Sequence, residues 1–216
     1  MNIAAMLAAV AAHKATGGTV VLSTTSQTIT ALSVSLALPQ LECLAKLKTF
    51  FHSVGIDHVL DIVAARQVTN AETAQEFMER VTIEGSGSVN GVLSSTCPGW
   101  VCYVEKSQPC ALPFLSSVRS PQQIQGVIVK TIIARAIGVP SSRIFHCTLM
   151  PCFDKKLEAM RLQFAPEDVP DVDMVHPSRP PPLSIIIERS RSNSCITGGH
   201  TFRAAVAPSR RRHRDC

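Results

Sequence analysis

Apolar residues along the chain form short β-branched runs, separated by longer stretches in which apolar residues recur every three or four positions. The first pattern is typical of buried strands, and the second is typical of helices that pack one face against a core. Four such runs predict strands, and they cover Thr19–Ser23, His58–Val63, Val89–Ser94 and Ile144–Leu149.

Helical spacing fills the intervals between these runs. The first predicted helix carries Ile29, Leu32 and Leu36, and the second runs from Leu41 to Val54 and stops at Gly55. The third starts from an N-cap at Asn70 and continues through Glu79, and the fourth runs from Ser120 to a stop at Gly138. Strands that alternate with helices of this length imply crossover connections between parallel strands. The predicted fold class is therefore α/β, with a mainly parallel sheet covered by helices on both faces.

Charge divides the chain at residue 175. Residues 1–175 carry 13 Lys and Arg against 14 Asp and Glu, whereas residues 176–216 carry eight Arg, no Lys and two acids, so the basic excess belongs to the tail. The tail also holds five prolines and six serines and has no periodic apolar face, so we expect it to be disordered. Its arginines lack the interleaved aromatic residues of a nucleic-acid reader, so we do not expect nucleic-acid binding.

The organisation that follows is an N-terminal apolar segment at 1–17, a partial α/β domain at 18–175 and a basic tail at 176–216. The apolar segment from Ile3 to Ala12 is shorter than the roughly 20 residues of a membrane-spanning helix. No basic residue precedes it, as one would in a signal peptide. We therefore expect no membrane association and an intracellular chain.

Two of the eight cysteines lie in segments that directly follow predicted strands. Cys97 stands in Thr-Cys-Pro-Gly-Trp after the third strand, and Cys152 stands in Met-Pro-Cys-Phe-Asp-Lys-Lys after the fourth. Because the carboxyl ends of parallel strands share one edge of the sheet, the two thiols are expected to meet there. Backbone amides and a helix dipole near such a turn stabilise thiolate, which is the form that binds iron.

These two segments, with Leu112–Gln123 between them, resemble the first two cluster motifs of the iron-only hydrogenase family. The continuation from Trp100 to Lys106 is more similar to the non-enzymatic branch, the cytosolic iron–sulfur assembly factors and the nuclear prelamin A recognition factor-like proteins. The resemblance covers about residues 18–175. It implies a partial, truncated iron-only hydrogenase-like fold and a cytoplasmic chain, with the nucleus as a second location.

The resemblance also implies roles for individual residues. Cys97 and Cys152 match two of the four cysteines that hold a [4Fe-4S] cluster, and Lys155 matches a lysine beside the adjoining di-iron unit of hydrogenases. Thr96 stands where hydrogenases have a proton-shuttle cysteine, and a hydroxyl is too weak an acid for that task at neutral pH. The family's N-terminal cysteine cluster and its third motif, which supplies the other two ligands, are absent, so the ligand set in this chain is incomplete.

Each of these residues also has a structural interpretation. A lone cysteine in apolar surroundings is most often a small buried hydrophobe, and Lys155 alone would be a surface or capping lysine. Among the other cysteines, Cys102 and Cys147 are expected in the core, whereas Cys110 in a loop is the candidate additional ligand. His146 on a strand is expected to be a hydrogen-bonded core residue.

Three hypotheses about function follow. The first is a cluster-binding protein, or a fragment of one, that works with protein partners of the cytosolic iron–sulfur assembly complex and turns over no substrate. The second is a hydrogenase-like redox enzyme, which Thr96 and the missing third motif disfavour. The third is a truncated fragment without a cluster. We further expect the tail to be a non-homologous end produced by a frameshift, a retained intron or a gene-model error, which sequencing of the transcript across codon 175 tests.

Overall fold

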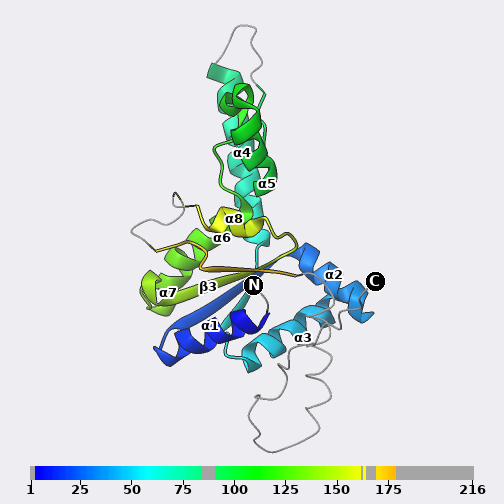
Figure 1. Cartoon of the computed structure of the whole chain (residues 1–216), viewed down its shortest axis with the longest axis vertical. Helices are drawn as coiled ribbons and strands as arrows, with labels where there is room; N and C mark the ends of the chain where they lie inside the picture. Colours follow the sequence, from blue (N-terminus) through cyan, green and yellow to red (C-terminus); the bar gives the residue numbers. More distant parts are fainter. Residues whose placement is uncertain (1–2, 84–90, 162, 164–168, 179–216) are drawn as a thin grey trace, which may run out of the picture.

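The computed structural model describes residues 3–83, 91–161, 163 and 169–178. Its centre is a four-stranded sheet in the order β2-β1-β3-β4, in which every neighbouring pair is parallel. Figure 1 shows this sheet in the lower half of the molecule, with helices on either side. The strands are β1 (Thr19–Thr24), β2 (His58–Asp61), β3 (Ile144–Met150) and β4 (Met174–Pro177). The predicted α/β class with a parallel sheet is confirmed.

Helices cover both faces of the sheet because the strands are apolar on both sides. Val20 and Leu22 of β1 face one core, while Val21 between them faces the other, as the period of a strand requires. Three helices pack on the Val20 face: α1 (Ile3–Ala15), α2 (Ser26–Leu36) and α3 (Gln40–Ser53). The Val21 face is covered by α6 (Pro121–Ile128), a π-helical turn (Val129–Ile133) and α7 (Ala134–Ile137).

The helix α1 accounts for the predicted apolar segment at the N-terminus. Met6 and Val10, one turn apart, are both fully buried in the core that α1 shares with α2 and α3. Among the helices of the described part of the chain, none is by itself both long and apolar enough to cross a membrane. The pair α2 and α3 reaches the required length and composition only together, and its two members are bent by 100°.

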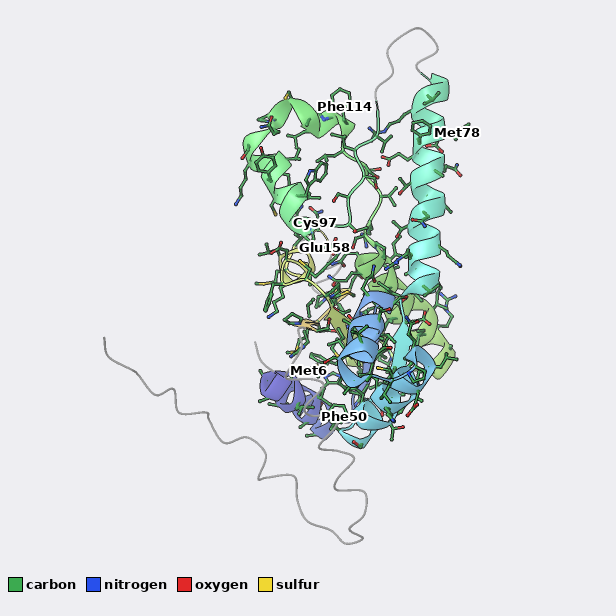
Figure 2. The ribbon with its side chains drawn as sticks, turned by 90° about the vertical axis from the view of Figure 1, so that its right-hand side faces the viewer. Met6, Phe50, Met78, Cys97, Phe114 and Glu158 are labelled. Atoms are coloured by element: carbon green, nitrogen blue, oxygen red, sulfur yellow. The ribbon has the colours of Figure 1, made fainter. Side chains whose placement is uncertain are left out.

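A second lobe rises from one end of the sheet (Figure 1). It contains α4 (Val63–Ile83), α5 (Pro98–Ser107) and the short 3₁₀ helix η1 (Pro109–Phe114), which are seen from another side in Figure 2. The prediction that Asn70 caps this helix is wrong, because α4 begins seven positions earlier at Val63. The carboxylate of Asp61 accepts a hydrogen bond from the Val63 amide there, at 3.0 Å.

The predicted third strand is also wrong where the structure describes it. Residues 89 and 90 lie outside the described residues, and of residues 91–94 only Leu93 forms an isolated parallel bridge, with Leu115. This segment belongs to the second lobe and is not part of the sheet. The fourth member of the sheet is instead β4, which pairs with β3 from Cys147 to Met150.

Buried polar groups link β3 to β1 on one side and to the residues that precede β4 on the other. The ring of His146, which is fully buried, bonds the Ser23 hydroxyl and the Asp171 carbonyl, each at 2.9 Å. Burial lowers the pKa of His146 to about 4, so the ring is neutral at physiological pH. The ammonium of Lys130 donates to Asp173 at 2.7 Å, and the same carboxylate accepts from the His146 amide. His146 is thus the hydrogen-bonded core residue that the sequence predicted.

The strand β4 extends two residues past the predicted domain boundary at 175, and Val175 and His176 are both buried. From residue 179 onward the predicted disordered tail lies outside the described residues. Two short helices complete the described elements, and these are η3 (Ser141–Arg143) before β3 and α8 (Lys155–Ala159) after it.

Candidate functional site

A cavity of about 440 Å³ lies where the strands of the sheet end and the second lobe begins. It is lined by residues that follow β1, β2 and β3, together with the first residues of α5 and α6. Both cysteines that the sequence singled out, Cys97 and Cys152, line this one cavity. The edge formed by the carboxyl ends of parallel strands is the usual place for ligands in such folds.

The end of β3 positions Cys152. The strand stops at Met150, whose carbonyl accepts a hydrogen bond from the Ser178 amide at 2.7 Å, and Pro151 then turns the chain into the cavity. Cys152 follows as a half-buried free thiol, and α8 begins three residues later. A parallel strand with a partner on each side is a rigid support, so this thiol has a fixed place.

Cys97 reaches the cavity by a different route from the one predicted. It does not leave the end of a sheet strand, because it follows an irregular segment of the second lobe. It stands instead at the N-cap position of α5, with Pro98 as the first helical residue. Its amide donates to the Ser95 hydroxyl at 3.1 Å, and its side chain makes no capping hydrogen bond. The exposed thiol is therefore not used in capping its own helix.

The two cysteine motifs also touch each other. A Cβ atom placed on Gly99 would lie 2.7 Å from the Asp154 carboxylate and 3.8 Å from the Cys97 sulfur. Because Gly99 belongs to the first motif and Asp154 to the second, this contact places the segments side by side. Figure 2 shows Cys97 at the base of the second lobe, near Glu158 of α8.

Lys155 lines the same cavity, and its ammonium is already engaged. It donates to the Glu158 carboxylate at 2.9 Å and to the Ser120 hydroxyl at 3.3 Å. The side-chain nitrogen Nε2 of Gln122 donates to the Lys155 carbonyl at 3.1 Å, which links the start of α6 to the start of α8. Thr96, predicted to stand beside the cysteine site, is also among the residues of the cavity wall.

The charged residues that line the cavity are cations. They are Arg66 of α4 and Lys155, and no aspartate or glutamate is among the lining residues that the structure describes. The guanidinium of Arg66 donates to the side-chain oxygen of Gln27 at 3.0 Å, so α2 and α4 are linked across the opening. Arg66 thus brings positive charge to the cavity, which suits an anionic ligand.

Sequence reasoning missed Arg66 and Gln27, because only the fold brings α2 and α4 to the cysteines. It also missed Thr25, the N-cap of α2, whose hydroxyl accepts from the Thr28 amide at 3.1 Å. A signal for Thr25 exists in the sequence, since a polar turn directly follows the first strand. Arg66 has no such signal, because a basic residue within a helix shows no distinguishing local pattern.

The other cysteines that the structure describes lie outside this cavity. Cys110 is exposed on η1, whose last residue, Phe114, lies at the far end of the second lobe from Cys97 in Figure 2. Cys102 on α5 accepts a hydrogen bond from Arg161 at 3.3 Å. Cys147 is fully buried in β3, and burial raises its pKa to about 12, so it stays a thiol. Within the residues the structure describes, no three His, Cys, Asp or Glu side chains are grouped to hold a metal ion.

Comparison with known proteins agrees with the resemblance. The family model described as "Iron only hydrogenase large subunit, C-terminal domain" matches residues 18–179. A probable cytosolic Fe-S cluster assembly factor of Drosophila persimilis is 42% identical over 170 residues, which are 75% of this chain and 35% of the relative. The cytosolic Fe-S cluster assembly factor nar1 of Aspergillus fumigatus is 46% identical over 112 residues, or 51% of this chain and 19% of the relative.

Solved structures with the same fold are hydrogenases. A variant of the FeFe-hydrogenase HydA1 from Chlamydomonas reinhardtii superposes with a TM-score of 0.70 at 25% identity, covering 81% of this chain and 43% of the hydrogenase. A HydA structure from a study of stepwise H-cluster assembly gives a TM-score of 0.69 at 26% identity, covering 81% and 42%. The chain thus spans about a third of the length of the assembly factor from Drosophila persimilis and less than half of the hydrogenases.

Proposed function

The chain belongs to the family of the iron-only hydrogenase large subunit, C-terminal domain, and from this premise we propose that it binds an iron–sulfur cluster as part of cytosolic iron–sulfur protein assembly. The proposed ligands are Cys97 and Cys152, and the proposed cluster is of the [4Fe-4S] type. The observation that carries this proposal is that two thiols from separate motifs line one cavity at the end of a parallel sheet.

The cavity suits such a cluster in its donor atoms and its charge. Iron–sulfur clusters are held by cysteine thiolates, and a cluster with thiolate ligands is an anion. Of the two cationic residues of the wall, Lys155 is paired with Glu158, and Arg66 supplies positive charge that favours an anion there. Gln122 and Thr96 add polar groups of the kind that tune a cluster through hydrogen bonds.

Two thiolates are half of the set that a four-iron cluster requires. The chain spans only part of the length of its relatives, so we propose that the remaining ligands come from residues outside this part of the fold or from another chain. Cys110 stays a candidate additional ligand. Its exposed position on η1 means that it would have to reach the cluster of another molecule or move toward this one.

We propose that the chain is not a hydrogenase. The position next to the cluster cysteine holds Thr96, which lines the cavity and offers a hydroxyl where proton transfer at neutral pH needs a more acidic group. The curated relatives with the higher sequence identity are named assembly factors, whereas the hydrogenases share about a quarter of the residues. Its place of action would accordingly be the cytosol, and its partners the proteins of the assembly machinery.

Anaerobic reconstitution tests this proposal. The full chain is incubated with ferrous iron and sulfide, desalted, and assayed for bound iron and acid-labile sulfide. We expect equal amounts of both in the wild-type chain and a loss of at least about half of each in Cys97→Ser and in Cys152→Ser. The matched control is Cys102→Ser, which changes a thiol one turn further along α5 and outside the cavity.

Each alternative has its own result. Wild-type chain that binds neither iron nor sulfide would support the fragment without a cluster and would overturn the proposal. Equal binding by the wild-type chain and both ligand variants would place the cluster elsewhere. A loss in Cys110→Ser would add that residue to the ligands. A hydrogen-uptake assay on the loaded chain is expected to show no activity, and activity would restore the hydrogenase hypothesis.

A further inference from the structure

The described part of the chain offers a four-iron cluster two thiols in one place and no further ligand beside them. Cys97 and Cys152 line the cavity at the end of the sheet, and no other cysteine of the described residues is in its wall. No three His, Cys, Asp or Glu side chains of this part of the chain are grouped to hold a metal ion. Since a [4Fe-4S] cluster is held by four cysteines, these two thiols are half of a ligand set.

The two cysteines lie where a group from another molecule can reach a ligand bound to them. Cys97 is exposed at the start of α5, and its side chain is not used in capping that helix. Cys152 is half-buried, and the residue after it, Phe153, is exposed. Figure 2 shows Cys97 at the base of the second lobe, beside Glu158 of α8. The proposed ligands thus stand at the surface between the two lobes.

An apolar ridge on α8 begins at the residue that follows Cys152. Phe153, Leu157 and Met160 recur at helical spacing on α8 and its flanking turns, and they are 48%, 51% and 80% exposed. We call these three residues the α8 ridge. Ala159 points the other way and packs against a buried apolar cluster of the sheet. A row of exposed apolar side chains on one face of a helix is typical of a surface that binds another protein.

We propose that two copies of this chain bind one [4Fe-4S] cluster between them, each copy supplying Cys97 and Cys152, with the α8 ridges buried in the contact. This inference rests on the proposed function and names the source of the missing ligands. A two-fold axis presents the same surface of each copy to the other, so two thiols on one copy become four around the axis. A cubic cluster of alternating iron and sulfide has two-fold axes itself, and each of them exchanges its irons in pairs.

The rival source of ligands is the chain itself. Cys195 and Cys216 lie outside the described residues, and together they would also bring the number of thiols to four. The two sources differ in stoichiometry, because a cluster completed within one chain holds about four irons per chain and a shared cluster about two. They differ in oligomeric state as well, since only the shared cluster requires a dimer.

Anaerobic analytical ultracentrifugation of the full chain, with iron and sulfide counted in each sedimenting species, tests the shared cluster. We expect the loaded wild-type chain to sediment as a dimer with about two irons and two sulfides per chain, and the iron-free chain to sediment as a monomer. Removal of the iron by a chelator should return the dimer to the monomer. The double variant Cys195→Ser, Cys216→Ser should keep both the dimer and its iron.

The α8 ridge is tested separately by Met160→Glu, which places a charge on the ridge and removes no thiol. We expect the dissociation constant of the loaded dimer to rise at least about tenfold, the factor that corresponds to losing the burial of one apolar side chain. The matched control is Leu41→Glu, which alters an apolar residue of α3 that is 83% exposed and lies outside the ridge. Equal dissociation constants in Met160→Glu and the wild-type chain overturn the role of the ridge.

The outcomes separate this inference from the proposed function. A loaded chain that stays a monomer with about four irons overturns the shared cluster and leaves cluster binding intact. Loss of the iron in the double variant Cys195→Ser, Cys216→Ser has the same meaning, because it makes the tail the source of ligands. Failure of the wild-type chain to take up any iron overturns cluster binding itself.

Discussion

Glu76 of α4 binds the segment that leads into α6, and its replacement gives a sharp test of this structure. Its side chain on α4 is only 12% exposed. The carboxylate accepts hydrogen bonds from the Ser117 amide at 2.8 Å and the Ser117 hydroxyl at 2.9 Å, and also from the hydroxyl of Ser116 and the guanidinium of Arg80. These serines precede the start of α6, which lines the cavity.

The pKa of Glu76 gives the size of the expected effect. Burial by itself would raise this pKa, but the hydrogen bonds from Ser116, Ser117 and Arg80 outweigh it and lower the pKa from 4.5 to about 2. That lowering corresponds to about 3 kcal/mol of stabilisation at neutral pH. Allowing for solvent screening near the surface, we expect Glu76→Gln to lower the free energy of unfolding by about 2 kcal/mol at pH 7.

The sign of the pH dependence follows from the direction of this change. Because the folded pKa lies below the unfolded value, the stabilisation is complete above pH 4.5 and is lost as the pH falls toward 2. Urea unfolding followed by circular dichroism, from pH 7 to pH 2.5, measures it. The difference between the wild-type chain and Glu76→Gln should shrink across this range, whereas Glu79→Gln, an exposed change on the same helix, should have little effect. A constant difference at every pH would refute the reasoning.

Two further changes test the packing around the sheet. Gly126→Ala should lower the free energy of unfolding by about 1–3 kcal/mol in urea titration. Alanine favours a helix more than glycine does, but the new Cβ would lie 2.6 Å from the Asp171 carbonyl oxygen. A stability equal to that of Gly91→Ala, whose added methyl group meets no atom within 4 Å, would contradict this. Lys130→Met should lower the free energy of unfolding by about 3–5 kcal/mol, since it leaves the Asp173 carboxylate without its ion-pair partner. Adding Asp173→Asn should recover part of this loss. A double variant as unstable as the sum of the two single variants would argue against a coupled pair.

Three of the four strands were predictable because they are apolar on both faces. Val20, Val21 and Leu22 form a continuous run only because helices cover both sides of β1, and such a run is a strong local signal. The strand β4 was missed because it is short and contains His176 and Pro177. Its position depends on pairing with β3 and on the buried polar groups between them, which no local pattern shows.

The errors in the second lobe have a related cause. Asn70 has the character of an N-cap residue, but the helix had already begun at Val63, where Asp61 meets its first amide. Val89–Ser94 was predicted as a strand from its composition, yet at its described residues this segment pairs only at Leu93. In the first case a nearer capping residue, Asp61, sets the start of the helix, and in the second a weak local preference for strand finds only one bridging partner.

The site was predictable in its cysteines but not in its surroundings. Cys97 and Cys152 do line one cavity, although Cys97 arrives at the start of α5 and not at the end of a sheet strand. The cation Arg66 comes from a helix whose place beside the cysteines is set by packing. Motifs therefore pointed to the thiols, and only the fold supplied the charge around them.

The order of strands in the sheet also has a consequence for biosynthesis. Thr19 of β1 pairs with Ile144 of β3, so the central pair of the sheet joins segments that are far apart in the sequence and are synthesised at different times. Until β3 emerges, the apolar faces of β1 and of the helices around it have no complete cover. A nascent chain with such long-range pairing folds slowly and is prone to aggregate, so its yield in cells should depend on chaperones that hold it during translation.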